Sequence, residues 1–510
     1  MVPDWSIHLP SGLAPADVDL AAGGSLPGAF IRAWTTDPQR TVLSTLDGEA
    51  VSAAELEERT GVAATAYAGA GLVPGDRVLF SAATSVEMVV AYVGALRAGL
   101  TVVPANTGYS PAELAALAAA AGPAAAVLDD PGRLELAGPV VTPALVGLPG
   151  GNSGLVLDAS SAGDTALIIY TSGTTGKPKG VPLSHGNLLA SAHAVRIAWR
   201  WTPDDTLALC LPLFHVHGLG VGLHGTLVTG AAATLIPRFE PPAVAAAVAG
   251  GATLLFGVPT MYHSLAASAA LSDLGRLRLA VSGSAPLPAE LHAAIRAGSG
   301  QAVLERYGMT ETVMLVSNPY DGERRPGTVG FPLPGVSVRL EPRDGGTAAL
   351  LDVSAPQASL EIQVRGPNVI TGYLDNPGAT AEAYTSDGWF RTGDLGTVDE
   401  DGYLSISGRA KELIITGGYN VYPREVEELL RTHPGIADAA IVGAPSPKWG
   451  ETVVAFVVPA PSAPASLVAD LEAYCEANLV SYKRPREWHL VESIPRNALG
   501  KVLRHELKVG

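Results

Sequence analysis

The sequence predicts an α/β protein with a large first domain and a smaller, mixed α+β second domain. Over the first 165 residues, short apolar runs alternate with segments of helical periodicity, which indicates doubly wound, mainly parallel sheets with helices on both faces. After Gly408 the remaining residues have a mixed helix and strand pattern of their own. We therefore expect domains at residues 1–408 and 409–510 in a chain of 510 residues, which is long enough for two or three domains.

The elements of the first domain follow from local signals. Strands are expected at 77–80, 101–103, 124–128 and 166–169, where short apolar runs occur. Helices are expected from 51 onward, over 85–97, from Ser110-Pro111, and from Ser184 as a cap to about Arg200. The alanine runs at 118–121 and 245–247 indicate helix packing rather than low complexity.

The composition restricts the class of protein. Hydrophobic residues make up 47% and charged residues 16%, and the formal net charge is −16. This balance argues against a nucleic-acid partner and an anionic membrane surface. The first residues lack the cationic and apolar regions of a signal peptide, and no apolar run approaches the roughly 20 residues of a membrane helix. Cys210 and Cys475 form no metal or redox motif, so a cytoplasmic protein is expected.

The glycine-rich segment 170–180, Tyr-Thr-Ser-Gly-Thr-Thr-Gly-Lys-Pro-Lys-Gly, is the first functional signal. Glycines let the backbone approach a ligand closely, and N–H groups, hydroxyls and ammonium groups bind phosphate oxygens. The segment differs from the P-loop, because two residues separate Gly173 from Gly176 and Pro178 follows Lys177. It predicts polyphosphate binding, with an ordinary surface loop as the alternative.

Further polar residues follow short apolar runs. The segment 211–219 has two histidines in an apolar frame, for which a strand end with core histidines is the simpler interpretation. The segment 253–259 is expected to be a strand and then a turn, and 279–286 a strand ending in small residues, which suit a flat ring. An aromatic ring, a hydroxyl and a carboxylate lie close together in 305–312, Glu-Arg-Tyr-Gly-Met-Thr-Glu-Thr. In 388–395 a turn precedes Asp394, whose carboxylate suits the two hydroxyls of a ribose.

The second domain begins near Gly408-Arg-Ala-Lys411. Helices are expected at 422–430 and 467–479, and strands at 439–442 and 453–458.

Five of these motifs, in order and at matching separations, resemble those of the adenylate-forming superfamily, which includes acyl-CoA synthetases, peptide synthetase adenylation domains and luciferases. They are 170–180, 307–312, 389–394, Gly408-Arg409 and 495–501, and the resemblance covers essentially the whole chain. It implies a large N-terminal domain of several subdomains and a small C-terminal domain that rotates about a hinge. Among acyl-CoA synthetases, 305–312, 317–322 and 211–219 are most similar to malonyl- and methylmalonyl-CoA synthetases.

The resemblance implies roles for the residues that match the family's nucleotide site. The ATP phosphates would lie against Thr171, Ser172, Gly173, Thr174, Thr175, Gly176, Lys177 and Lys179. Tyr307 would stack on adenine beside Gly283, Ser284 and Ala285. Thr310 would contact the α-phosphate, Glu311 would help to hold Mg²⁺, and Asp394 would bind the ribose with Arg409 nearby.

Other matching residues would serve the acid and the second step. Lys501 would bridge the carboxylate and α-phosphate oxygens, and His215 would line the acyl pocket near the reacting carboxylate, together with Val258 and Ser264. Lys411 occupies the hinge position, with an ordinary charged loop as the alternative. Gly417 and Gly418 resemble the loop that reaches the active site for thiol transfer.

The implied activity is that of an AMP-forming acyl-CoA synthetase, with ATP, Mg²⁺ and CoA as co-substrates and cofactor. The enzyme would convert a carboxylic acid and ATP into acyl-AMP and pyrophosphate, and then form the CoA thioester and AMP. Mg²⁺ and Lys501 would neutralise charge on the α-phosphate, so no side-chain nucleophile is required.

Three alternatives remain at the level of the sequence. The acyl group could be loaded onto a carrier protein, although the chain stops soon after Lys501 with no carrier domain. A luciferase-like oxygenase would need assumptions that ligase chemistry does not. A nucleotide-binding protein without catalysis would not need Glu311 and Lys501.

The identity of the acid depends on one departure from the pattern. The resemblance implies that malonyl- and methylmalonyl-CoA synthetases use an arginine just after a Val-Pro-Thr turn, and the matching position here is Ser264. A serine supplies neither the charge nor the two-pronged geometry of a guanidinium, although Arg238 or His263 could substitute for it. The sequence therefore predicts a larger, mostly apolar acid, with malonate or methylmalonate as the alternative.

Overall fold

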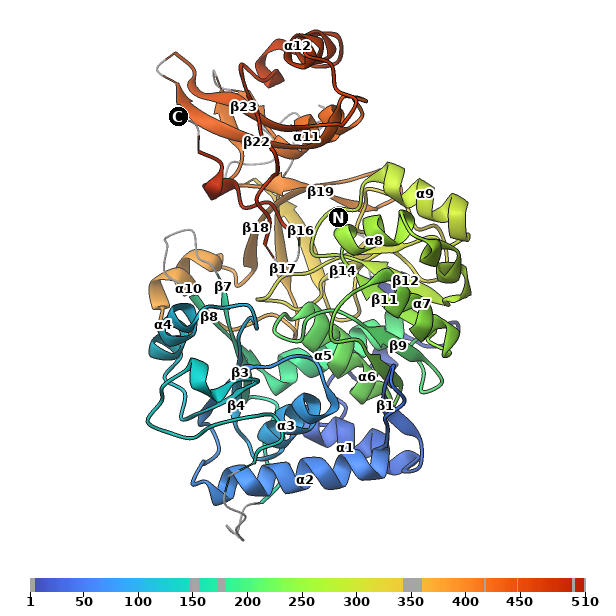
Figure 1. Ribbon diagram of the computed structural model, residues 1–510, viewed down its shortest axis with the longest axis vertical. Coiled ribbons are helices and arrows are strands. Elements are labelled where there is room, and N and C mark those ends of the chain that lie inside the picture. Colours follow the sequence, from blue (N-terminus) through green and yellow to red (C-terminus); the bar gives the residue numbers. More distant parts are fainter. Residues whose placement is uncertain are drawn as a thin grey trace. The chain divides into compact units, whose positions relative to one another are not determined.

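The computed structural model describes residues 5–146, 148, 156–171, 179–342, 360–416, 419–446, 448–497 and 500–508 (Figure 1). The chain divides into two compact units. The larger unit comprises Pro3–Ser337 and Val364–Phe390, and the smaller unit comprises Met1–Val2, Val338–Gln363 and Arg391–Gly510. The expected α/β class, with parallel sheets and a separate C-terminal domain, is confirmed.

The first sheet of the larger unit has six strands in the order β6-β5-β3-β4-β7-β8. They are β3 (Arg77–Ser81), β4 (Thr101–Pro104), β5 (Ala125–Leu128), β6 (Val140–Val141), β7 (Thr165–Thr171) and β8 (Lys179–Ser184). Neighbouring strands are parallel except β7 and β8, which form an antiparallel hairpin. The strands expected in this region are confirmed, whereas β8 was not predicted.

The second sheet of the larger unit has nine strands in the order β15-β14-β13-β12-β11-β9-β10-β1-β2. They are β1 (Thr41–Thr45), β2 (Ala50–Ser52), β9 (Thr206–Leu209), β10 (Ala232–Leu235), β11 (Leu254–Gly257), β12 (Leu279–Ser282), β13 (Leu304–Tyr307), β14 (Val316–Ser317) and β15 (Phe331–Pro332). The strands from β13 to β1 are parallel, and antiparallel pairs close both edges. Parallel strands place their carboxyl ends at one edge, where ligands bind in open α/β sheets.

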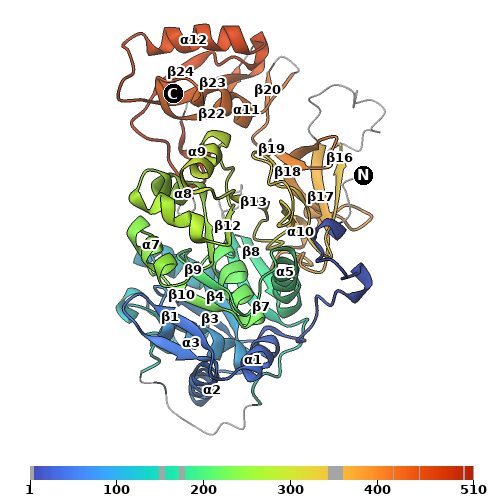
Figure 2. The same cartoon turned by 90° about the vertical axis from the view of Figure 1, so that its right-hand side faces the viewer.

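Several helices of the larger unit begin at a capping serine. The helices of this unit are α1 (Leu26–Thr36), α2 (Ala53–Gly69), α3 (Val86–Arg97), α4 (Pro111–Ala121), α5 (His185–Ala198), α6 (His224–Thr229), α7 (Pro241–Ala249), α8 (Pro259–Ala266), α9 (Ala289–Ser299) and α10 (Pro377–Ala383). The hydroxyls of Ser85, Ser110 and Ser184 each accept a hydrogen bond from the backbone N–H three residues on. Helices α2 and α3 lie side by side in both views (Figure 2).

Two of the expected boundaries were wrong. Val51 lies in β2, and the following helix begins at Ala53, because the Ser52 side chain accepts from the Glu55 N–H and caps the helix there. The segment after Val258 is helix α8 rather than a turn, because Pro259 occupies the first helical position, where its missing N–H is not needed.

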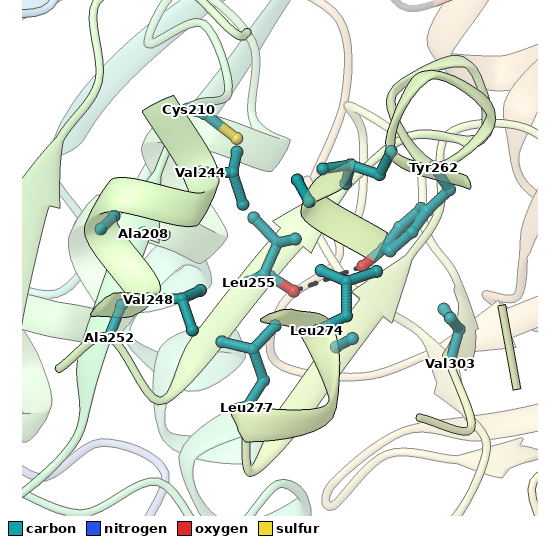
Figure 3. Close-up of a cluster of buried hydrophobic side chains, with 14 of the residues drawn as sticks. Ala208, Cys210, Val244, Val248, Ala252, Leu255, Tyr262, Leu274, Leu277 and Val303 are labelled. Carbon is teal, nitrogen blue, oxygen red and sulfur yellow. Dashed lines mark hydrogen bonds between the residues drawn. The ribbon is translucent and has the colours of Figure 1, made fainter. Parts of the chain in front are cut away.

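A buried apolar cluster between the second sheet and α7, α8 and α9 holds the strand ends in place (Figure 3). Tyr262 is fully buried, and its hydroxyl lies 2.9 Å from the Val281 carbonyl oxygen and 3.5 Å from that of Leu255. One phenol thus joins α8 to β11 and β12, two of the strands whose carboxyl ends carry predicted site residues.

The smaller unit contains two sheets. The first has the order β16-β17-β18-β19, comprising β16 (Ser337–Glu341), β17 (Leu360–Arg365), β18 (Phe390–Val398) and β19 (Leu404–Arg409). The second is formed by β20 (Ile414–Thr416), β21 (Tyr419–Val421), β22 (Ile436–Ser446), β23 (Gly450–Pro459) and β24 (Glu487–Leu490). In the latter only β23 and β24 pair in parallel.

The two faces of β22 and β23 have different coverings. Helices α11 (Pro423–Arg431) and α12 (Leu467–Asn478), both predicted, pack on the face that includes Ile441 and Val453. The opposite face, which includes Val442 and Val454, packs against the C-terminal segment through Ile494. The segment that carries Lys501 is therefore seated on the sheet rather than on the helices.

In the parts of the chain that the structure describes, no helix is long and apolar enough to cross a membrane. Cys210 and Cys475 are free and buried.

Buried histidines make the larger unit sensitive to acid. Burial lowers the pKa of His8 and of His185 to about 4 and that of His224 to about 3. These rings are neutral when folded and bind protons when unfolded at pH 6.5 and below, so stability is lost as the pH falls from 6.5 toward 4. Each ring with a pKa near 4 should remove about 2 kcal/mol by pH 5.

The measurement is urea unfolding at pH 7 and at pH 5 for His8→Gln, with the exposed His263→Gln as the control. We expect His8→Gln to reduce the loss in free energy of unfolding between pH 7 and pH 5, because glutamine does not bind a proton in this range. The glutamine amide can still donate to the Phe331 carbonyl, which His8 contacts at 3.2 Å. An unchanged loss would contradict the prediction.

Candidate active site

The predicted phosphate-binding segment connects the two strands of the β7–β8 hairpin. Thr171 ends β7, Lys179 begins β8, and the two residues are direct partners across the hairpin. The remaining predicted phosphate contacts, Ser172, Gly173, Thr174, Thr175, Gly176 and Lys177, lie outside the described residues. A short hairpin is a suitable frame, because it fixes both ends of the segment.

Lys179 is linked to the predicted metal-binding carboxylate through Tyr373. The Lys179 ammonium lies 5.2 Å from the centre of the Tyr373 ring, and the Tyr373 hydroxyl donates to Glu311 Oε1 at 2.9 Å. The Ile370 N–H donates to the Glu311 carbonyl, and the Leu374 N–H to that of Gly180. The segment 370–374 therefore holds the hairpin and the carboxylate together.

The carboxyl ends of β12 and β13 bring the predicted adenine site together. In the register, Ser282 pairs with Glu305, so Gly283 follows directly beside Arg306 and Tyr307. Ser284 has φ +68°, a strained conformation for a residue with a side chain. Gly283 and Tyr307 are buried, whereas Ser284, Ala285 and Thr310 are partly accessible. Small residues thus face an aromatic ring at one sheet edge.

The two histidines of 211–219 do not lie at a strand end, because β9 ends at Leu209. His217 begins a π-helical segment, His217–Leu223, a rare form that is frequent at functional sites. Burial lowers the pKa of His215 to about 4 and that of His217 well below 6.5, so both rings are neutral at pH 7. His217 Nδ1 lies 3.2 Å from Ser284 Oγ, which joins the π-helical segment to the predicted adenine site.

The predicted ribose pair lies in the smaller unit. Asp394 is inside β18, beyond the turn that precedes Phe390, and its direct partner on β19 is Arg409. Arg409 Nε and Asp394 Oδ1 are 2.7 Å apart, and the carboxylate side chain is 6% exposed. Two residues from separate motifs are therefore brought together by strand register.

Lys501 is held by contacts of its own segment. Its N–H donates to Asn497 Oδ1 at 2.9 Å, and Arg496 donates to the Gly500 carbonyl and pairs with Asp438 at 2.6 Å. Arg504 pairs with Glu427 at 2.6 Å and Glu412 at 3.2 Å. Lys501 as a residue is exposed.

Surroundings lower the pKa of Lys501 below its ordinary value of 10.5, first by partial dehydration and then through Arg409, whereas Glu412 and Asp394 oppose the shift. If the charged form of Lys501 assists adenylation, the rate of pyrophosphate exchange into ATP should decrease as the pH rises, and this decrease should begin below pH 10.5. A pH profile of kcat/KM checks this, with thioester formation from preformed acyl-AMP as the reference. The same alkaline decrease in both reactions would contradict the assignment of Lys501 to adenylation.

Residues predicted for the hinge and the acyl pocket have different environments. Lys411 is exposed in the turn between β19 and β20, and Gly417 and Gly418 lie outside the described residues. Val258 is 2% exposed at the start of α8, whereas Ser264 is exposed and its hydroxyl donates to the Thr260 carbonyl. The two suggested replacements, Arg238 and His263, are also exposed.

Sequence reasoning missed two residues of this region. Tyr373 follows a glycine in an irregular segment, and nothing in that pattern reveals its contact with Glu311. Arg306 is 6% exposed within the strand β13, and an arginine in an otherwise buried strand was a signal that could have been used.

Comparisons with known proteins agree with this arrangement. Residues 30–374 match the AMP-binding enzyme family, and residues 425–501 match the AMP-binding enzyme C-terminal domain. Sulfoacetate–CoA ligase of Cupriavidus necator is 38% identical over 93% of this chain and 95% of its own length. Feruloyl-CoA synthase of an Amycolatopsis species is 36% identical over 90% of this chain and 94% of that protein.

Other relatives align over a shorter part of their length. Mitochondrial malonate–CoA ligase of Bos taurus is 39% identical over 69% of this chain and 66% of that protein. A probable CoA ligase of Humulus lupulus is 38% identical over 67% of this chain and 61% of its own length. The crystal structure of ATP-bound MatB from Rhodopseudomonas palustris has a TM-score of 0.85 and 38% identity, covering 95% of this chain and 98% of that one.

These matches span both predicted domains and include whole relatives named as CoA ligases. The chain therefore belongs to the AMP-binding enzyme family of the adenylate-forming superfamily, and it is an AMP-forming acid–CoA ligase that binds ATP and resembles malonyl-CoA synthetases.

Proposed function

We propose that this ligase activates a carboxylic acid as its acyl-adenylate, with Mg²⁺ bound beside ATP, and then transfers the acyl group to the thiol of CoA. The observation that carries the proposal is the cluster of Lys501, Arg409 and Asp394 in the smaller unit, where a cation for the α-phosphate accompanies the predicted ribose pair. A carrier protein as the acceptor thiol remains the alternative. A cytoplasmic location stays a prediction from the sequence.

The residues near Glu311 fit a magnesium ion that is bound mainly by nucleotide phosphates. Glu311 is 8% exposed, and its Oε1 accepts from the Tyr373 hydroxyl. In the part of the chain that is described, no group of three His, Cys, Asp or Glu side chains could hold a metal. Mg²⁺ often uses one or two carboxylates with substrate phosphates and water, and when bound it would withdraw charge from the phosphates.

The side chains then have separate tasks. Tyr307 and the small residues after β12 would hold the adenine, and Asp394 with Arg409 would hold the ribose. Lys179 and Thr310 would bind phosphate oxygens, and Lys501 would stabilise charge on the α-phosphate as the carboxylate attacks. Neutral His215 adds no charge beside the reacting carboxylate, because burial keeps its pKa near 4.

We propose further that residues 409–510 rotate relative to residues 1–408 between the two steps. Lys411 lies between two anchors, because Arg409 pairs with Asp394 on β18 and Glu412 pairs with Arg504 of the C-terminal segment. A pivot at Lys411 would leave both ion pairs intact.

The acid itself has two candidates. Ser264 in place of an arginine favours a larger, mostly apolar acid without a second charged group, because a serine cannot pair with such a group. The similarity to malonyl-CoA synthetases favours malonate or methylmalonate, and the exposed position of Ser264 reduces its weight as the determinant of the acid.

The proposal is tested by measuring exchange of labelled pyrophosphate into ATP with a panel of carboxylic acids, followed by AMP release with CoA present or absent. We expect acid-dependent exchange without CoA and AMP release that requires CoA. If no acid in the panel supports pyrophosphate exchange, adenylation is refuted. If AMP is released only when a carrier protein is present, the carrier protein is the acceptor.

A further inference from the structure

The loop that carries Glu311 contains a residue in a strained conformation. This loop connects β13 to β14, and within it Val313 has φ +56°, in the left-handed region that a β-branched residue rarely adopts. Val313 is buried, and its carbonyl oxygen would lie 2.1 Å from a Cβ added to Gly308. Such a conformation persists only where the surrounding contacts hold it in place.

Asn368 supplies contacts on both sides of Val313. Its side-chain amide donates to the Thr312 carbonyl at 2.7 Å and to the Met314 carbonyl at 2.6 Å. Asn368 is 2% exposed, and its Oδ1 is buried with no hydrogen-bond partner in the described part of the chain. The amide therefore serves this loop through its donors while its own acceptor stays unpaired, and the two bonds fix the backbone direction at Val313.

The same stretch of chain also holds Glu311 at two points. The Ile370 N–H donates to the Glu311 carbonyl at 3.0 Å, and the Tyr373 hydroxyl donates to Glu311 Oε1 at 2.9 Å. The segment 368–373 therefore fixes both the carboxylate and the backbone that follows it.

This segment is itself anchored to the frame of the phosphate-binding hairpin. Asn187 Nδ2, in the first turn of α5, donates to the carbonyls of Pro367 at 2.8 Å and Val369 at 3.0 Å. The Leu374 N–H donates to the Gly180 carbonyl of β8 at 3.0 Å. Helix α5 follows β8 directly in the chain, so one short segment joins the hairpin to the loop that carries the carboxylate.

We propose that Asn368 and Tyr373 are positioning residues for Glu311, which direct its carboxylate toward the magnesium ion of bound Mg·ATP. Asn368 acts by keeping Val313 left-handed, and Tyr373 acts by its hydrogen bond to the carboxylate. The inference rests on the proposed function, in which Glu311 helps to hold Mg²⁺. A loop released from these contacts would adopt the binding conformation only part of the time, and the apparent affinity would fall by that fraction.

The test measures ATP binding by calorimetry in Mg²⁺ and in EDTA, so that the gain in affinity due to Mg²⁺ is obtained without turnover. Tyr373→Phe keeps the ring beside Lys179 and should lower the affinity in Mg²⁺ by about 10-fold, as expected for one hydrogen bond to a charged group. Asn368→Ala should lower it by about 10-fold or more, because the strained backbone is released. The affinity in EDTA should stay close to the native value in both variants.

Two double variants separate positioning from the loss of buried contacts. Val313→Gly and Val313→Ala both remove the valine side chain, but only glycine adopts a positive φ without steric cost. Combined with Asn368→Ala, Val313→Gly should restore most of the lost affinity, whereas Val313→Ala should not.

Equal affinities in the two double variants would overturn the role of Asn368. If Asn368→Ala shows no cooperative thermal transition, the double variant with Val313→Gly decides. Recovery of folding and of affinity in Mg²⁺ would support the inference, and failure to fold would show that Asn368 serves the core instead of Val313.

Glu311→Gln distinguishes this inference from the proposed function. It should lose the gain in affinity due to Mg²⁺, because a neutral amide replaces the carboxylate. If it does, and Tyr373→Phe and Asn368→Ala keep the native affinity in Mg²⁺, the positioning role is wrong and the metal site stands. If Glu311→Gln keeps the gain, the metal assignment fails together with the inference. A failure of adenylation itself would appear only in pyrophosphate exchange, on which none of these outcomes depends.

Discussion

Lys501→Ala is expected to lower acid-dependent pyrophosphate exchange by about 100- to 1,000-fold, the range found when one preorganised charge-stabilising donor is removed. The same protein given preformed acyl-AMP and CoA should make thioester at close to the native rate. The physical reason is that negative charge concentrates on the α-phosphate only while pyrophosphate leaves. Thiol attack on the acyl carbon happens after that charge has gone.

The structure makes Lys501→Ala an interpretable variant. The segment is positioned by the Lys501 N–H and by Arg496, which alanine leaves in place. Lys501 is exposed, its side chain makes no hydrogen bond within the described part of the chain, and the apolar contacts of the segment come from Ile494 and Val502. Lys508→Ala, an exposed lysine seven residues further on, is the matched control and should retain both half-reactions. Equal losses in both half-reactions of Lys501→Ala would refute the division of labour.

Much of the fold could be predicted because its signals are local. Caps such as Ser110-Pro111 and Ser184 satisfy N–H groups within one turn, and short apolar runs are buried in parallel sheets, so both are visible in a few consecutive residues. The boundary at Val51 was wrong because the same apolar residue satisfies a strand and a helix start. The turn expected after Val258 was wrong because proline is equally compatible with a turn and with the first position of a helix.

The site was harder to predict where its contacts are distant in sequence. Asp394 and Arg409 were both found from motifs, but their ion pair depends on the register between β18 and β19. Tyr373 acts on Glu311 across 62 positions of sequence, and no periodicity reports such a contact. The environment of Arg306 depends on Gly283, which directly follows another strand, β12.

These distant contacts also divide the site by unit. Glu311, Lys179 and Tyr307 belong to the larger unit, whereas Asp394, Arg409 and Lys501 belong to the smaller one. Rotation about a point after Arg409 would move Lys501 while the Asp394–Arg409 pair stays on its own sheet. Because Arg409 is paired with Asp394, which lies before the proposed moving part, a pivot that preserves this ion pair must lie after Arg409.

Lys411→Pro tests that pivot. Proline fixes φ near −65° and restricts the residue before it, here Ala410, so it should impede rotation without removing a charge from the predicted nucleotide site. We expect pyrophosphate exchange within about threefold of native and acyl-CoA formation reduced by about 10-fold or more, because a conformational step then limits the second half-reaction.

Lys411→Ala is the matched control, since it removes the same side chain and leaves φ free. Lys411→Ala should retain both half-reactions. The ion pairs on either side, Arg409–Asp394 and Arg504–Glu412, should also stay intact, because neither includes Lys411. Loss of exchange in Lys411→Pro would indicate that the variant is held out of the adenylating arrangement. Intact thioester formation in Lys411→Pro would show that rotation occurs about a different residue, or that the turn between β19 and β20 already has a φ that proline can adopt.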